Sequence, residues 1–96
     1  MPDETIVEVP ALVGGKREMP LRVGALPTMV GELCRREASL VEMAVDAAVL
    51  GDRDLALQAL ALDPLAGDID VLRAMLDDYL ETHRAALPQF NGRWSL

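Results

Sequence analysis

The sequence predicts a mainly α-helical protein in which three helices follow a short N-terminal β-hairpin or extended segment. Apolar residues recur at three- and four-residue steps over residues 27–50 and again over 69–86, which is the spacing of one helix face. Leucine and alanine, both strong helix formers, dominate residues 53–62 between them. β-Branched residues and a glycine pair mark the start of the chain. We therefore divide the chain into an extended segment, a helical domain and a tail, at residues 1–26, 27–90 and 91–96.

The N-terminal segment is predicted to contain two short extended pieces. Residues 5–10, TIVEVP, alternate weakly around β-branched side chains and end at a proline, which favours a strand that residues 11–13 extend. Gly14-Gly15 form a turn, and residues 19–23 form a second extended piece that Gly24 ends. A lone hairpin is marginal in water, so this one is expected to need a sheet or a helix to lie against.

A long first helix is expected over residues 27–50, because Pro27 suits a first helical turn and Gly51 suits the left-handed position just past a helix end. At about 1.5 Å per residue this helix would be roughly 35 Å long. Glu37 interrupts its apolar stripe, either as an edge residue that reaches water or as a carboxylate placed for a partner group that this chain lacks. The other stripe positions are Val30, Leu33, Cys34, Leu40, Val41, Ala44, Val45 and Ala48.

The second helix, expected over residues 53–62, is the element around which the rest of the chain is predicted to be organised. Asp52 suits its N-cap, and Asp63 ends it because a residue before proline is disfavoured in the α conformation. Only three of its ten residues are polar. A helix that is apolar nearly all round must be covered on most sides. We therefore expect it to be buried, and Leu60→Ala to cost about 2–5 kcal/mol of stability.

A third helix is expected over residues 69–86, after an N-cap at Asp68. Its polar face spaces Asp70 and Arg73, and Arg73 and Asp77, for surface ion pairs worth about a few tenths of a kcal/mol each. Its apolar face is predicted to contain Ile69, Leu72, Leu76, Tyr79, Leu80, His83 and Leu87.

The composition argues against several classes of partner. Sixteen acidic residues against nine basic ones give a net charge of −7, which disfavours a nucleic-acid surface and an anionic membrane surface. The N-terminus lacks the apolar core of a signal peptide, and no apolar run approaches the length that spans a bilayer. The single cysteine suits the reducing cytoplasm, which is the expected location. Near the C-terminus, Phe90 and Trp94 are expected either to fold back onto the helices or to dock on another surface.

Composition and spacing alone indicate no catalysis. A phosphate-binding glycine loop, a paired-cysteine metal pattern and a nucleophile elbow are all missing from the sequence. Cys34 and His83 stand 49 residues apart on different expected helices, and we interpret them as a small buried hydrophobe and as the polar edge of a helix face. We therefore predict no catalytic, cofactor-binding or metal-binding residue in this chain. The closely spaced carboxylates fit capping and a solvated helix face better than acid–base work; they are Asp52, Asp54, Asp77 and Asp78.

Four segments, in order along the chain, resemble glycoside hydrolase family 4. The longest reads EMAVDAAVLGDRDLALQALALDP over residues 42–64. The others are Pro2-Asp3 with Val7-Glu8-Val9-Pro10 (PDxxVEVP), residues 20–27 (PLRVGALP) and residues 83–90 (HRAALPQF). Together they extend over nearly the whole chain, so the resemblance is specific.

This resemblance implies an unusual glycosidase. The family includes α-glucosidases, α-galactosidases and 6-phospho-glucosidases, and it is the NAD-dependent exception to hydrolysis by two carboxylates. Its members use NAD⁺ and a divalent metal, commonly Mn²⁺. They oxidise the sugar at C3, remove the acidified C2 proton, eliminate the glycosidic oxygen, add water and return the hydride. Members open with a nucleotide-binding Rossmann domain, so the full-length fold would be α+β.

The resemblance also implies that this chain is a C-terminal piece of a longer enzyme, whether a remnant, a shortened reading frame or a separately expressed domain. The metal-binding cysteine and histidine of the family, and its catalytic base, belong to earlier segments. Cys34 and His83 do not match those positions, so no role transfers to them. NAD and Mn²⁺ are implied for the full-length family, and no cofactor is expected in this chain.

The expected role of the chain is structural, and we expect it to be catalytically silent alone. It would pack against the missing catalytic domain, help shape the substrate side and contribute to oligomer contacts. The alternative is a free-standing helical interaction subunit or adaptor. Because the first helix is longer than the second can cover, and because strand edges recruit other chains, self-association into a dimer is also expected.

Overall fold

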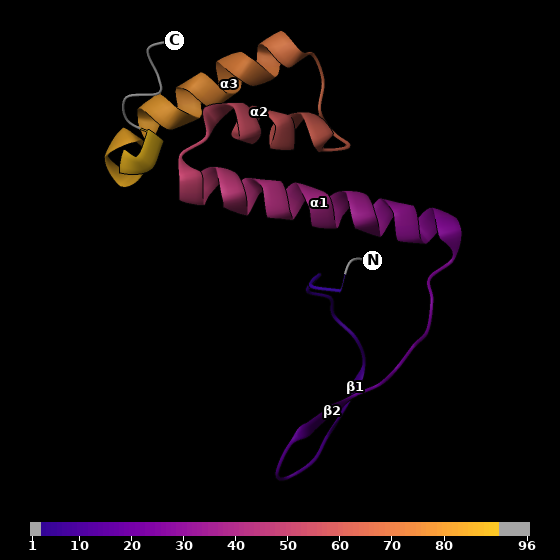
Figure 1. The fold of residues 1–96 in the computed structure, drawn as a ribbon. Coiled ribbons are helices and arrows are strands. Elements are labelled where there is room, and N and C mark those ends of the chain that lie inside the picture. The colour runs from indigo at the N-terminus through magenta and orange to yellow at the C-terminus, as the bar shows by residue number, and fades with distance from the viewer. Residues whose placement is uncertain (1–2, 91–96) are drawn as a thin grey trace. The chain divides into compact units, whose positions relative to one another are not determined.

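The structure is a computed structural model that describes residues 3–90. Three helices follow a two-stranded hairpin, which confirms the predicted mainly α fold with a short β element at its start (Figure 1). The chain forms two compact units, Met1–Arg35 and Arg36–Leu96, and each is described separately below. The expected division at residues 26/27 and 90/91 stays a prediction, and Trp94 lies outside the described residues.

In the first unit, strands β1 (Ala11–Val13) and β2 (Glu18–Pro20) form an antiparallel pair. The backbone N–H of Gly14 donates to Arg17 O at 3.0 Å across the turn, and Leu21 N–H donates to Pro10 O at 2.8 Å beyond the last strand pair. The strand expected at residues 5–10 is not formed, although all six residues are described. Those residues have no neighbouring strand to pair with, because β2 is opposite residues 11–13.

Both faces of this hairpin are exposed to solvent. Leu12 is 62% exposed, Val13 80% and Met19 48%. Apolar strand residues normally lie on a covered face, and a lone two-stranded hairpin is marginal in water. The hairpin therefore has the composition of a half-buried sheet without a covering element in its own unit.

Helix α1 (Thr28–Leu50) continues into the second unit, where its C-terminal half runs beside α2 (Arg53–Leu62) (Figure 1). The turn at Gly51 joins the two helices at one end, and Arg36 Nε donates to Leu62 O at 2.8 Å near the other. Between these contacts the covered side of α1 carries Leu40, Met43 and buried Ala47. Of these three residues, only Leu40 belongs to the stripe predicted from the sequence.

Most of the predicted stripe of α1 lies on a different side and is exposed. At about 100° per residue, Val41 and Val45 point roughly 120° or more away from the side on which Ala47 lies. Val41 is 58% exposed and Val45 55%. The helix is apolar on two sides, and the neighbouring helix covers only the narrower one. Glu37 lies in the middle of the uncovered side and is exposed, which agrees with both interpretations of this residue.

Local sequence determines the ends of α2 and α3 (Ile69–Thr82) as expected. Asp52 Oδ1 accepts the N–H of Leu55 at 3.1 Å, and Asp68 Oδ1 accepts the N–H of Asp70 at 2.7 Å, so both aspartates are N-caps. Asp63, which precedes a proline, adopts extended backbone angles (φ −61°, ψ 133°) and ends α2.

The core of the second unit lies between α2, α3 and the segment that follows α3. Leu76, Leu80 and Phe90 form its buried cluster, so Phe90 folds back onto the helices, one of the two expected outcomes. The partly buried residues around the cluster are Ala56, Leu57, Leu60 and Leu87. Ala59 of α2 is buried and most of its other residues are half-buried, so the helix is less deeply buried than expected. The neighbouring helices leave one side of α2, that of Asp54, Gln58 and Ala61, open to solvent.

Helix α3 is shorter than expected and its apolar face is narrower. It ends at Thr82 rather than residue 86, and the chain continues through 3₁₀ turns at Arg84–Ala86 and Pro88–Phe90. These tighter turns carry Leu87 and Phe90 back over the helix. Leu72, Leu76 and Leu80 are buried, whereas Ile69 is 44% and Tyr79 54% exposed, because packing neighbours lie on one side only.

Gly51 is the point where these segments meet. It has φ +65°, which confirms the expected left-handed C-cap of α1, and it is buried. A Cβ at this position would lie 2.0 Å from the backbone O of Gln89. The side chain of Gln89 donates from Nε2 to Ala48 O at 2.9 Å, which holds the last 3₁₀ turn on the C-terminal end of α1. Only a hydrogen fits between the two backbones here.

Gly51→Ala should therefore destabilise the helical unit by about 2 kcal/mol or more, through left-handed strain and displacement of the 89–90 segment. Urea unfolding followed by circular dichroism measures this loss. Gly67→Ala is the matched control, since Gly67 has no atom within 4 Å of its Cβ position and no positive φ. The control should stay within about 0.5 kcal/mol of the parent. Equal effects of the two changes would contradict this packing.

Candidate functional site

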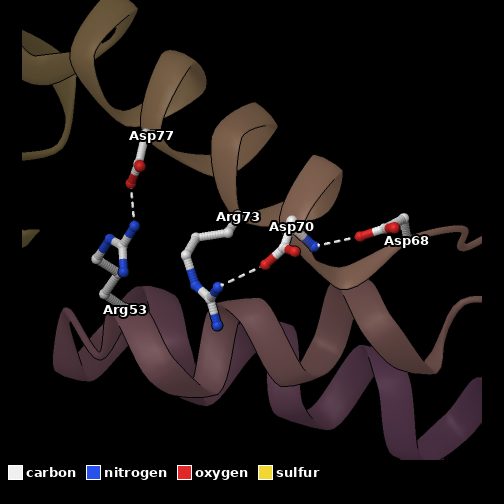
Figure 2. A network of polar contacts seen from close by, with 5 residues as sticks. All are labelled: Arg53, Asp68, Asp70, Arg73 and Asp77. Carbon is white, nitrogen blue, oxygen red and sulfur yellow. Dashed lines mark hydrogen bonds and ion pairs between the residues drawn. The ribbon is translucent and has the colours of Figure 1, made fainter.

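One polar contact joins α2 to α3 (Figure 2). Arg53, whose side chain is 20% exposed, donates from Nη2 to Asp77 Oδ1. The sequence led us to expect Arg73 as the partner of Asp77, but the structure pairs Asp77 with Arg53 across the two helices instead. Arg53 Nε is buried and has no hydrogen-bond partner among the described residues. The pair links the two helices. Because Asp77 is half-exposed, the pair contributes about 1 kcal/mol or less to the free energy of unfolding.

The remaining carboxylates in this region are used locally, at the start of α3 (Figure 2). Asp68 caps the helix, and Asp70 Oδ1 accepts from Arg73 Nη1 at 3.1 Å, which confirms that expected ion pair. Asp54 and Asp78, the other members of the close carboxylate pairs, are exposed. General acid–base catalysis needs a carboxyl group held against a reacting atom. Asp68, Asp70 and Asp77 are each hydrogen-bonded within or between helices instead.

Cys34 and His83 lie in different elements and in different environments. Cys34 is half-buried on α1, and His83 is exposed at the C-cap of α3, where its backbone N–H donates to Tyr79 O at 3.0 Å. Within residues 3–90, no three histidine, cysteine, aspartate or glutamate side chains are grouped so that they could hold a metal ion.

The described residues fit neither cofactor of the resembled family. Mn²⁺ is bound by several oxygen or imidazole donors, and the donor set that would supply them is not brought together in this part of the chain. A dinucleotide is held by a glycine-rich turn from a strand into a helix. Between β2 and α1 the chain reads LRVGALP, with a single glycine. No step of any reaction is therefore assigned to these residues.

A small pocket lies beside the connection between α2 and α3. Its volume is about 170 Å³, smaller than the roughly 300 Å³ at which ligand sites begin. Its only carboxylate, on Asp63, already accepts the N–H of Leu65 at 2.8 Å. Without converging polar groups, this pocket is suited to an apolar side chain rather than to a sugar. Its lining residues are Leu60, Asp63, Leu65, Ala66, Leu72 and Met75.

The uncovered side of α1 is a more extensive feature than the pocket. We define the α1 apolar surface as Glu37, Val41, Ala44, Val45 and Ala48, all of which are exposed and belong to the second unit. Four of its five members are apolar. An exposed apolar helix face of this kind commonly marks a contact with another protein surface. It is the feature of the described chain with the clearest capacity for binding.

Comparison with known proteins identifies the context of these surfaces. Residues 1–66 match the Family 4 glycosyl hydrolase C-terminal domain. The chain belongs to this family. It is 39% identical over 90 residues to a probable 6-phospho-β-glucosidase of Bacillus subtilis, and 33% identical over 81 residues to the phospho-α-glucosidase PagL of Clostridium acetobutylicum. An α-galacturonidase of Bacillus subtilis is 40% identical over 65 residues. No solved structure shows a significant match.

The family 4 chain spans only a small part of these relatives. The matches cover 94%, 84% and 68% of this chain but 20%, 18% and 15% of the three enzymes, respectively. The chain thus corresponds to about a fifth of a family 4 glycosidase, at the C-terminal end.

No helix in residues 3–90 is long and apolar enough to cross a membrane.

Proposed function

We propose that this chain is the C-terminal domain of a family 4 glycosidase. It completes the rest of that enzyme, here called the body, and the body carries the catalytic and cofactor-binding residues. The match of residues 1–66 to the family's C-terminal domain carries this proposal. The described polar groups agree with it, because they cap helices and pair with one another instead of converging on a pocket. The chain alone is catalytically silent in this proposal.

We favour a structural role that several enzymes share over a role in substrate specificity. The three relatives carry the names of a β-glucosidase, an α-glucosidase and an α-galacturonidase, yet all match the same chain. A region shared by enzymes that are named for different sugars and anomers is expected to stabilise the fold that these enzymes share. Packing against the body, and supporting the substrate side indirectly, are such roles.

The assembled enzyme would hydrolyse a glycosidic bond by the NAD-dependent oxidation and elimination of family 4. We propose phosphorylated glucosides as the substrate class, because two of the three relatives are named phospho-glucosidases. NAD and Mn²⁺ would be held by the body, since the described residues of this chain fit neither. The single cysteine supports the cytoplasm as its location.

The partner we propose is that body, which would cover the exposed hairpin and the α1 apolar surface. Without it, these surfaces would drive self-association of the isolated chain. Apolar area that is covered in an assembly is usually covered by another copy when the assembly is missing. An adaptor role for a free-standing chain would use the same surfaces.

Complementation tests this function. The Bacillus subtilis relative without its matched segment should hydrolyse a chromogenic 6-phospho-β-glucoside poorly in NAD⁺ and Mn²⁺, and this chain alone should not hydrolyse it. Mixing the two, or fusing them, should raise the rate, because the chain restores the packing of the body. The relative's own C-terminal segment is the matched control. Restoration by that segment but not by this chain, or hydrolysis by this chain alone, would refute the proposal.

Self-association has a separate measurement. Light scattering of the isolated chain at micromolar concentration should give a mass above the 10.4 kDa of one chain, because its exposed apolar surfaces pair with each other. A monodisperse particle of one chain mass, with cooperative unfolding, would show instead that the chain closes its own core.

A further inference from the structure

We propose that the α1 apolar surface docks on the body of a family 4 glycosidase, and that the body presents a lysine or arginine side chain to Glu37. This inference rests on the proposed function and adds the orientation and chemistry of one contact. Its basis is a carboxylate placed among apolar side chains on a surface that the described chain leaves uncovered.

Glu37 lies inside the surface rather than on the charged side of the helix. At about 100° per residue, Val41 and Ala44 lie within roughly 40° of it around the axis, whereas Glu42 lies about 140° away. Glu37 makes no hydrogen bond and no ion pair with any described residue. When an apolar surface is covered, a carboxylate within it is desolvated as well, and the cost is several kcal/mol unless a cation pairs with it.

The neighbouring basic residues of α1 cannot supply that cation. Arg35 Nη1 lies 3.7 Å from Glu32 Oε1, one turn back on the polar side. Arg36 Nε donates to Leu62 O at 2.8 Å and holds α2. These are the only two basic residues of α1. Neither arginine of α1 pairs with Glu37, so we assign the cation to the surface that covers this side of the helix.

A second copy of the chain covers this surface when the body is missing but leaves both Glu37 carboxylates unpaired, so it fits less well than a surface that carries a cation. Pairing the α1 apolar surfaces of two copies brings together two carboxylates and no base. Complementary charge favours a different surface, one with an apolar depression and a cation. The relatives supply such a candidate by their length, since about four fifths of each enzyme lies outside the segment that this chain matches. The body is therefore the occupant we choose.

Binding in trans tests the contact. The Bacillus subtilis relative without its matched segment is immobilised, and the dissociation constant of the full 96-residue chain is measured for the parent, Glu37→Gln, Val41→Asp and Glu42→Gln. Glu37→Gln keeps the shape and leaves the cation of the body unpaired, so the constant should rise by roughly thirtyfold or more. Val41→Asp should abolish binding, and Glu42→Gln, on the other side of α1, should change it by less than about threefold.

Unfolding of each isolated variant is measured in parallel and should match the parent, because Glu37 and Val41 are exposed in the isolated chain. The same substitutions in a fusion, with this chain in place of the relative's own segment, provide a second readout as loss of thermal stability. This arm gives the answer if the trimmed body does not fold.

The outcomes separate the two proposals. Parent-like binding by Glu37→Gln, together with loss of binding by Val41→Asp, overturns the cation and leaves the proposed function standing. Parent-like binding by both variants overturns the docking surface. No binding by the parent, when the relative's own segment binds, overturns the proposed function itself. Self-association that Glu37→Gln strengthens and Val41→Asp abolishes would make a second copy the occupant.

Discussion

The close approach of Gln89 to Gly51 is the constraint on which the helical unit depends. The turn between α1 and α2 has room for a hydrogen only, and the left-handed backbone at Gly51 directs α2 back along α1. The same contact holds the last 3₁₀ turn in place, so that Leu87 and Phe90 reach Leu76 and Leu80. Gly51 thus determines both the turn between α1 and α2 and the position of the segment that completes the core.

The core closes against one side of α1 only, which leaves other apolar surfaces of the chain exposed. The core occupies the space between α2, α3 and the returning segment, and the only part of α1 it needs is a narrow side around Ala47. The broader apolar side of the helix remains open, as do both faces of the hairpin. The relative of Bacillus subtilis is about five times longer than the segment it shares with this chain, and we propose that these open surfaces are halves of interfaces with the rest of such an enzyme.

Sequence reasoning succeeded where structure is determined by neighbouring residues. Asp52 and Asp68 cap the starts of their helices and Asp63 ends α2, each through a residue one to three positions away. The family motifs were recognisable without coordinates. It failed where the outcome depends on distant partners. Which of two apolar sides of α1 is covered depends on the path of α2, and whether residues 5–10 form a strand depends on an available edge. The pairing of Arg53 with Asp77 has no local signal, since the two residues stand 24 positions apart on different helices.

Hydroxyl-radical footprinting tests most directly whether the open side of α1 is an interface with the body. Oxidation of Val41 and Val45 should be high in the isolated chain, below the concentration at which it self-associates, and should fall severalfold when the body is bound. Leu76 should be protected in both states. Val71, on the outer side of α3 and 64% exposed, should be oxidised in both. Unchanged oxidation of Val41 and Val45 in a complex that protects Val71 would contradict the account.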